Sequence, residues 1–325
     1  MSLSIRHARA AAVWLVGIAV GAILLWISLR SVDVHAVLAI ALRAEKKDLL
    51  GIVACGLIFI GLKAVRWGWL LRQLRQLPPG RLVGSVFAGT AANYGIPHSG
   101  ELIRVWIVAR QEGLPVAALL ASIALERLFD SCAALLLGVA ALLTGGEALD
   151  TLGTPLWVLL FFVVTILGAL LPFAVWPTGA LRASRSLLRP LPKAVSSSAL
   201  RHLEHGVEGL GSLQQGSILV QALTISVVQW ALMATCIWLS LCSVGVAPGP
   251  VQAVVTLLLL IVGLTLPAAP GQVGTTQVAF LLAAAPFGVG REEALAASII
   301  YNVVLPVPLI VIGVGVFLKI RSRRD

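Results

Sequence analysis

The stretch that decides the fold is Asn93–Arg104, which reads NYGIPHSGELIR inside an otherwise apolar run. Pro97 removes a backbone donor, and Gly100 supplies a turn or a fresh helix start. Glu101 and Arg104 stand three residues apart, so they share one helix face. Hydrocarbon tolerates broken backbone only where protein or a wet cavity covers it, and charges at that depth are expensive. The stretch therefore predicts one wall of a buried polar site in a membrane protein.

The composition of the whole chain agrees with that reading. Of 325 residues, 59% are hydrophobic and 12% are charged, whereas soluble domains carry roughly 25% charged residues. No polar stretch is long enough to fold alone, so we expect residues 1–325 to form a single all-α, polytopic integral membrane domain. The net charge of +10 is spread over short loops, as expected for contact with anionic lipid. Basic patches interleaved with aromatic residues are absent from the sequence, which excludes a nucleic-acid partner.

Cysteine and histidine residues give no sign of a metal or redox site. The four cysteines lie in apolar segments and form no CxxC motif, so they read as small core residues. His202 and His205 read as part of a solvated helix face rather than as metal ligands. The nucleotide-binding motif GxxxxGK[ST] is missing. No metal and no cofactor is expected.

Apolar runs long enough to cross a bilayer predict about six spanning helices. Residues 11–29 follow Arg6 and Arg9 and resemble a signal peptide, but the run is long and lacks a clear cleavage site, so we take it as a retained first span. A short surface helix is expected near Val34–Leu42, and residues 177–216 are expected to form a cytoplasmic amphipathic loop. The predicted spans are 11–29, 49–72, 115–143, 154–176, 217–244 and 293–318.

Two apolar segments are interrupted in their middle. Residues 82–110 break at Pro97, and residues 251–286 break at the sequence PAAPGQVGTTQ. Each piece is too short to cross comfortably, so we expect two re-entrant hairpins that enter from opposite faces. Paired interrupted segments point to a transporter site and favour an inverted repeat. The residues expected to make the breaks are Pro97, Gly100, Pro267, Pro270, Gly271 and Gly274.

The distribution of basic residues predicts the orientation. With the N-terminus in the cytoplasm and each hairpin returning to its own side, most of the 24 Lys and Arg residues fall on the cytoplasmic side. Both termini are then cytoplasmic.

Charged side chains inside the predicted spans form a second polar pattern. Glu126 and Asp130 share a helix face, about 17 and about 22 Å along their helix, near the middle of a core about 30 Å thick. Buried carboxylates need cationic or protonated partners. The predicted membrane segments contain four cationic candidates for this pairing: Lys63, Arg66, Arg104 and Arg127. The set reads either as an ion-pair network that locks helices together or as a binding site.

The residue types favour binding of an amphiphile with a phosphate-bearing headgroup. A guanidinium can donate two parallel hydrogen bonds to two phosphate oxygens. A buried carboxylate can carry a coupling proton, because burial raises its pKa. In the second hairpin, the helix start after Gly274 can aim backbone donors at a phosphate, with hydrogen bonds from Thr275, Thr276 and Gln277. The expected substrate-binding residues are Lys63, Arg66, Asn93, Glu101, Arg104, Glu126, Arg127, Asp130, Thr276, Gln277 and Asn302.

The assembled motifs resemble the membrane region of lysylphosphatidylglycerol synthase and flippase proteins. They are LKAVRWGWLLR, NxxxPxxGExxR at 93–104, LERLxD at 125–130 and LPxxPGxxG at 266–274. The resemblance implies movement of lipids between leaflets of a bacterial cytoplasmic membrane. It maps the family's polar positions onto Arg66, Asn93, Pro97, Gly100, Glu101, Arg104, Glu126, Arg127 and Asp130. Gln277 stands where the family often has Glu, and Asn302 about where it often has Arg, which implies a different headgroup preference.

Three functions are therefore weighed. The first is a lipid transporter, or flippase, for a phospholipid, polyprenyl-linked or other anionic or zwitterionic lipid. The second is a membrane enzyme acting on a lipid phosphate, with Glu101, Glu126 or Asp130 as acid or base; no catalytic signature appears, so an enzyme is not expected. The third is an accessory subunit of hopanoid or glycolipid synthesis. The expected partners are membrane lipids, with a homo-oligomer or a lipid-synthesis enzyme as further partners. The aminoacyl-transferase domain of the full-length synthases is not found, so lysyl transfer is not expected.

Overall fold

The computed structural model describes residues 2–30, 32–72, 74–96, 99–144, 164–165, 168, 177–187, 216–263 and 269–322. Throughout these ranges the chain is helical or in turns and contains no strand, which confirms the all-α prediction. Pro97, Pro267, His202, His205, nearly all of the predicted span 154–176 and most of the loop 177–216 lie outside the described residues.

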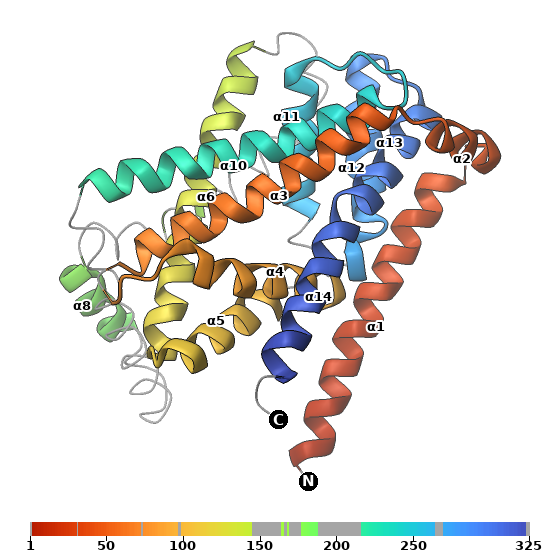
Figure 1. The fold of residues 1–325 in the computed structure, drawn as a ribbon. Helices are drawn as coiled ribbons and strands as arrows, with labels where there is room; N and C mark the ends of the chain where they lie inside the picture. Colours follow the sequence, from red (N-terminus) through yellow and green to blue (C-terminus); the bar gives the residue numbers. More distant parts are fainter. Residues whose placement is uncertain are drawn as a thin grey trace.

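From α1 to α6 and from α10 to α14, the helices follow one another with short connections (Figure 1). Prolines fix several starts, since α4, α11 and α14 begin at a proline, whose missing N–H is tolerated in a first turn. The helices are α1 (Ser2–Leu29), α2 (Val34–Leu42), α3 (Lys46–Leu70), α4 (Pro79–Gly95), α5 (Ser99–Glu112), α6 (Val116–Thr144), α8 (Pro177–Leu187), α10 (Gly216–Cys242), α11 (Pro250–Gly263), η3 (Pro270–Gln272), α12 (Thr275–Ala284), η4 (Ala285–Phe287), α13 (Arg291–Val304) and α14 (Pro306–Ser322).

Four helical segments in the described part of the chain are long and apolar enough to cross a membrane: α3, α6, α10 and the continuous stretch Arg291–Ser322. A fifth span exists if α1 and α2, which are bent by 92° to one another, count as one. These segments match the predicted spans 49–72, 115–143, 217–244, 293–318 and 11–29. The molecule is thus a multi-pass helical membrane protein, with four or five candidate spans among the described residues; the remaining predicted span, 154–176, lies almost wholly outside them.

The antiparallel pair α3 and α10 forms the centre of the molecule (Figure 1). Residue numbers fall along α10 as they rise along α3: Cys236 Sγ contacts the carbonyl oxygen of Ile52 at 3.8 Å, and Gln229 Nε2 donates to the carbonyl oxygen of Phe59 at 3.2 Å. The C-terminal end of α3 consequently lies beside the N-terminal end of α10.

Helices α4 and α5 form a tight hairpin around the stretch Asn93–Arg104. Near its tip, the Gly100 backbone N–H donates to Oδ1 of Asn93 at 2.7 Å, and Gly89 lies against Gly100 so closely that a side chain at either position would overlap the other helix. At its base, Arg75 donates to the carbonyl oxygen of Glu112 at 2.7 Å. The hairpin thus begins and ends at the C-terminal end of α3.

The second interrupted segment also folds into two packed helices, α11 and α12. Its turn contains positive φ angles at Gly271 (69°) and Gly274 (90°), which glycine adopts without strain. Its base lies at the C-terminal end of α10, where Trp238 Nε1 donates to the carbonyl oxygen of Pro248 at 3.0 Å. The bases of the two hairpins therefore lie at opposite ends of the α3–α10 pair. The hairpins meet in between, where η3 contacts α4.

The predicted span 293–318 is made of two helical segments that follow one another directly. α13 and α14 meet at Leu305, whose backbone stays helical (φ −68°, ψ −53°), so the stretch remains one candidate span. Pro306 removes the backbone donor that would continue the helical hydrogen bonding at this point. Gly313 of α14 then lies against the Phe87 backbone of α4.

Candidate functional site

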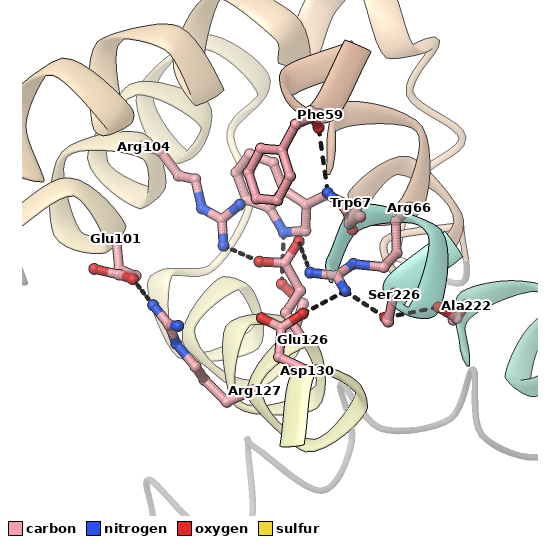
Figure 2. Close-up of polar contacts among 12 residues, drawn as sticks. Phe59, Arg66, Trp67, Glu101, Arg104, Glu126, Arg127, Asp130, Ala222 and Ser226 are labelled. Carbon is pink, nitrogen blue, oxygen red and sulfur yellow. Dashed lines mark hydrogen bonds and ion pairs between the residues drawn. The ribbon is translucent and has the colours of Figure 1, made fainter. Parts of the chain in front are cut away.

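An ion network links α3, α5, α6 and α10 (Figure 2). At its deepest point, Arg66 Nη1 donates to Oδ1 of Asp130 at 2.7 Å and to the hydroxyl of Ser226, while Nη2 lies 3.9 Å from Oε1 of Glu126. Only 1% of the Arg66 side chain is exposed. A charge buried this completely is stable only when paired, and three neighbours from two helices provide that pairing.

The next pair joins α5 to α6. Arg104 donates to Oε2 of Glu126, and both side chains are buried. The Arg104 guanidinium also lies over the Trp67 ring, 4.4 Å from its centroid, where the negative face of the ring attracts the cation. The Trp67 ring is held by its Nε1, which donates to the Ser122 hydroxyl at 2.9 Å.

The third pair, between Arg127 and Glu101, lies at the edge of the network (Figure 2). Arg127 follows Glu126 directly on α6, so it points to a different side of the helix and meets α5 instead of α3. Its side chain is 51% exposed, whereas that of Glu101 is 14% exposed. This is the pair of the network that substances outside the protein reach first.

Lys63, one turn before Arg66 on α3, adds a fourth cation. Its ammonium lies 6.0 Å from the centroid of the Phe59 ring, and it makes no ion pair with any residue that the structure describes. Four cations against three carboxylates leave a formal excess of one positive charge.

Two arginines of the network retain unused donors. Nε of Arg66 and both Nε and Nη1 of Arg104 are buried without a hydrogen-bond partner in the described part of the chain. The site therefore holds both positive charge and free N–H groups, the two features that bind phosphate oxygens.

The structure separates the expected binding residues into groups. Arg66, Glu101, Arg104, Glu126, Arg127 and Asp130 form the ion network, with Lys63 near it. Asn93 caps Gly100 within the hairpin. In the second hairpin, Gln277 accepts from the Gly274 N–H at 2.7 Å, and Thr276 donates to the Gln272 carbonyl oxygen at 3.1 Å, so both bond within their own turn. Asn302 lines a separate cavity.

Ser226 and Trp230 of α10 also belong to the site, although they were not identified as binding residues from the sequence. Ser226 accepts from Arg66, and Trp230 Nε1 donates to Oδ1 of Asp130 at 3.3 Å. Their spacing of four residues places both on one face of a helix otherwise rich in apolar residues, which is the signal that points to them.

The cavity next to this network has a volume of about 170 Å³. It lies between α3, α4, α10, α11, η3 and the junction of α13 with α14, where the two hairpins meet. Phe59 and Trp230 line it, and each also contacts the ion network, through Lys63 and Asp130 respectively.

Among the described residues, no group of three His, Cys, Asp or Glu side chains is placed to hold a metal ion. The four cysteines are free thiols. What the network offers instead is a set of ion pairs whose partners lie close enough to exchange: Glu126 is within reach of both Arg66 and Arg104.

Comparison with known proteins gives two findings. The chain is 28% identical over 298 aligned residues to a protein of Haloferax volcanii named glycosyltransferase AglD; the match covers 80% of this chain and 46% of that relative. The chain thus spans less than half the length of this curated relative. The family described as the lysylphosphatidylglycerol synthase TM region matches residues 14–313, which include both hairpins and the ion network. The chain therefore belongs to the lysylphosphatidylglycerol synthase transmembrane-region family.

Proposed function

We propose that the protein moves a lipid with a phosphate-bearing headgroup between the leaflets of a bacterial cytoplasmic membrane. The observation that carries the proposal is the buried ion network between the first hairpin and α6, with one cation in excess and unused arginine donors. Purely structural ion pairs are satisfied when charges and donors balance. Here an anionic oxygen would complete both, as a phosphate does.

The arrangement of the hairpins supports transport. Their bases lie at opposite ends of the α3–α10 pair and their tips meet beside the network, as expected for two re-entrant segments that enter from opposite faces. The first turn of α1 and the last turn of α14 lie at the same end of the molecule (Figure 1), in keeping with two cytoplasmic termini.

In this proposal the headgroup first meets the half-exposed Arg127, which exchanges its bond to Glu101 for a bond to phosphate. The freed Glu101 then faces Arg104, one turn further along α5. Arg104 and Lys63 receive the phosphate deeper in the protein, while the acyl chains stay in the surrounding lipid. Each step replaces one ion pair by another, so no charge is left unpaired in the low-dielectric interior.

The test is lipid movement in reconstituted vesicles. Purified protein is placed in vesicles containing a fluorescent phosphatidylglycerol, with and without a pH gradient, and dithionite quenches the fluorophore in the outer leaflet. We expect the wild type to bring inner-leaflet lipid to the outside. Glu101→Gln and Arg127→Ala should each reduce the rate by about tenfold or more, because each breaks the outer pair.

The matched control is Arg81→Ala, which removes an exposed arginine paired with Glu112 at the hairpin base, outside the network. It should insert and transport like the wild type. Wild-type rates in both network variants would exclude the ion network from the transport path.

A membrane enzyme is the second candidate, favoured by the similarity to the glycosyltransferase AglD of Haloferax volcanii. It predicts a chemically new lipid when the protein is incubated with a lipid phosphate and a sugar donor, detected by mass spectrometry. Unchanged lipid together with leaflet exchange favours the transporter.

A further inference from the structure

The cavity beside the ion network has a lining unlike that of the network itself. None of the residues that line it is charged. Its polar side chains are Thr90 and Tyr94 of α4, Gln272 of η3 and Tyr301 and Asn302 of α13, and the other lining residues are aliphatic or aromatic, apart from Gly56. It is therefore a place for an uncharged group with a few hydrogen-bonding atoms.

An acyl chain gains little by entering such a cavity. In a bilayer the surrounding lipid tails are as apolar as leucine side chains, so a hydrophobic driving force is lacking. An uncharged polar group behaves differently, because in hydrocarbon it has no hydrogen-bond partners at all. The cavity supplies those partners and excludes tails that cannot use them.

Asn302 indicates what the occupant must offer. Its Nδ2 is buried and has no hydrogen-bond partner among the described residues. A buried donor without an acceptor is destabilising, so a ligand that brings an oxygen to this point is stabilised in return. Hydroxyl oxygens accept from an amide and also donate to it, and they suit the neighbouring tyrosine hydroxyls equally well.

The size of the cavity limits the occupant to about one six-membered ring. An engineered protein cavity of about 150 Å³ holds benzene, and this cavity has about 170 Å³. Its aromatic walls, Phe59, Tyr94, Trp230 and Tyr301, can lie against the faces of such a ring.

We propose that this cavity binds the uncharged, hydroxyl-bearing ring of a lipid headgroup, a sugar or a cyclitol, whose phosphate lies at the ion network. This inference rests on the proposed function and names its substrate class. The link between the two places is direct, since Trp230 bonds Asp130 and the Phe59 ring faces Lys63. A ring in the cavity and a phosphate at Lys63 are neighbours, as they are in a phosphate-linked ring headgroup.

The experiment compares two short-chain phosphodiester lipids of the same charge, dihexanoyl phosphatidylinositol and dihexanoyl phosphatidylmethanol, which carries a methyl group in place of the ring. Calorimetric titration of the full chain in detergent gives both affinities. We expect the wild type to bind phosphatidylinositol about tenfold more tightly, the factor of one or two hydrogen bonds in a dry site. Asn302→Leu should reduce that preference to about twofold. Tyr301→Phe, which removes only a hydroxyl, should also reduce the preference. It replaces Asn302→Leu in the test if that variant does not fold.

The control is Gln252→Leu, which removes a buried amide of α11 outside the cavity lining and should keep the preference. Equal wild-type affinity for the two lipids, or a preference that survives both cavity variants, overturns the ring site. Lys63→Gln separates the two proposals, because it should lower the affinity for both lipids by the same factor. If Lys63→Gln lowers neither affinity while the preference for the ring remains, the phosphate site of the proposed function is wrong and the ring site is retained.

Discussion

At the scale of single residues, six ionisable side chains gather within a membrane protein, and each of the three carboxylates among them pairs with an arginine. The pairs are not equivalent. Arg66 and Arg104 are sealed inside, whereas Arg127 reaches the surface. Buried pairs contribute stability mainly because breaking one leaves an uncompensated charge, whereas an exposed pair contributes little. Stability should therefore depend on the inner pairs, and lipid contact on the outer one.

The first prediction concerns the innermost pair. Arg66→Met leaves Asp130 without its main partner and should destabilise the fold by about 3–5 kcal/mol. Adding Asp130→Leu removes the stranded charge and should restore much of the loss. The midpoint of thermal unfolding in detergent measures both.

Arg81→Met is the comparison, since its pair with Glu112 is exposed and should be worth less than about 1 kcal/mol. A double variant less stable than Arg66→Met alone would show that the Arg66–Asp130 pair is not what holds this region.

At the scale of helices, the first hairpin depends on glycine. Gly89 and Gly100 bring α4 and α5 together, and this contact sets how far Glu101 and Arg104 reach toward α6. A methyl group added at Gly100 would overlap the Gly89 carbonyl oxygen and lie 2.6 Å from Cγ of Asn93.

Gly100→Ala should therefore push the two helices apart, lower the unfolding midpoint, and reduce lipid movement through displacement of Glu101. Overpacking of this kind costs typically about 1–3 kcal/mol. Gly95→Ala, in the same hairpin but with open space around it, should leave both properties near wild type. Equal behaviour of the two variants would mean that the close crossing does not position the network.

Much of this arrangement was predictable from sequence, and the reason is energetic. Carboxylates in apolar helices need cationic or protonated partners, so Glu126 and Asp130 were expected to meet Lys or Arg side chains, and Pro and Gly marked both interruptions. Which arginine meets which carboxylate was not predictable. Arg66 and Arg104 were both candidates for Glu126, and the pairing follows from helix rotation and from the glycine crossing.

The cavity between the two hairpins was not predicted. It arises from contacts between segments far apart in the chain, here α3, α4, α11 and α13. Periodicity within one helix carries no information on such contacts.

At the scale of the whole molecule, two hairpins with bases at opposite ends surround one polar region. Gly80 and Gly249 mark the two bases, and a side chain at either position meets open space. In a variant lacking the four native cysteines, we expect Gly80→Cys to react with a membrane-impermeant maleimide only from the cytoplasmic side and Gly249→Cys only from the other. Labelling of both from one side would rule out opposed re-entrant hairpins.

The central claim is that the Glu101–Arg127 pair serves lipid passage rather than the fold, and a charge swap separates these roles. Glu101→Arg or Arg127→Glu alone brings like charges together; the two combined restore an ion pair with reversed polarity. We predict that the double variant regains the wild-type unfolding midpoint but moves fluorescent phosphatidylglycerol across reconstituted vesicles no faster than protein-free vesicles do. Wild-type lipid movement by the double variant would show that the pair is only a structural link, and would contradict the account.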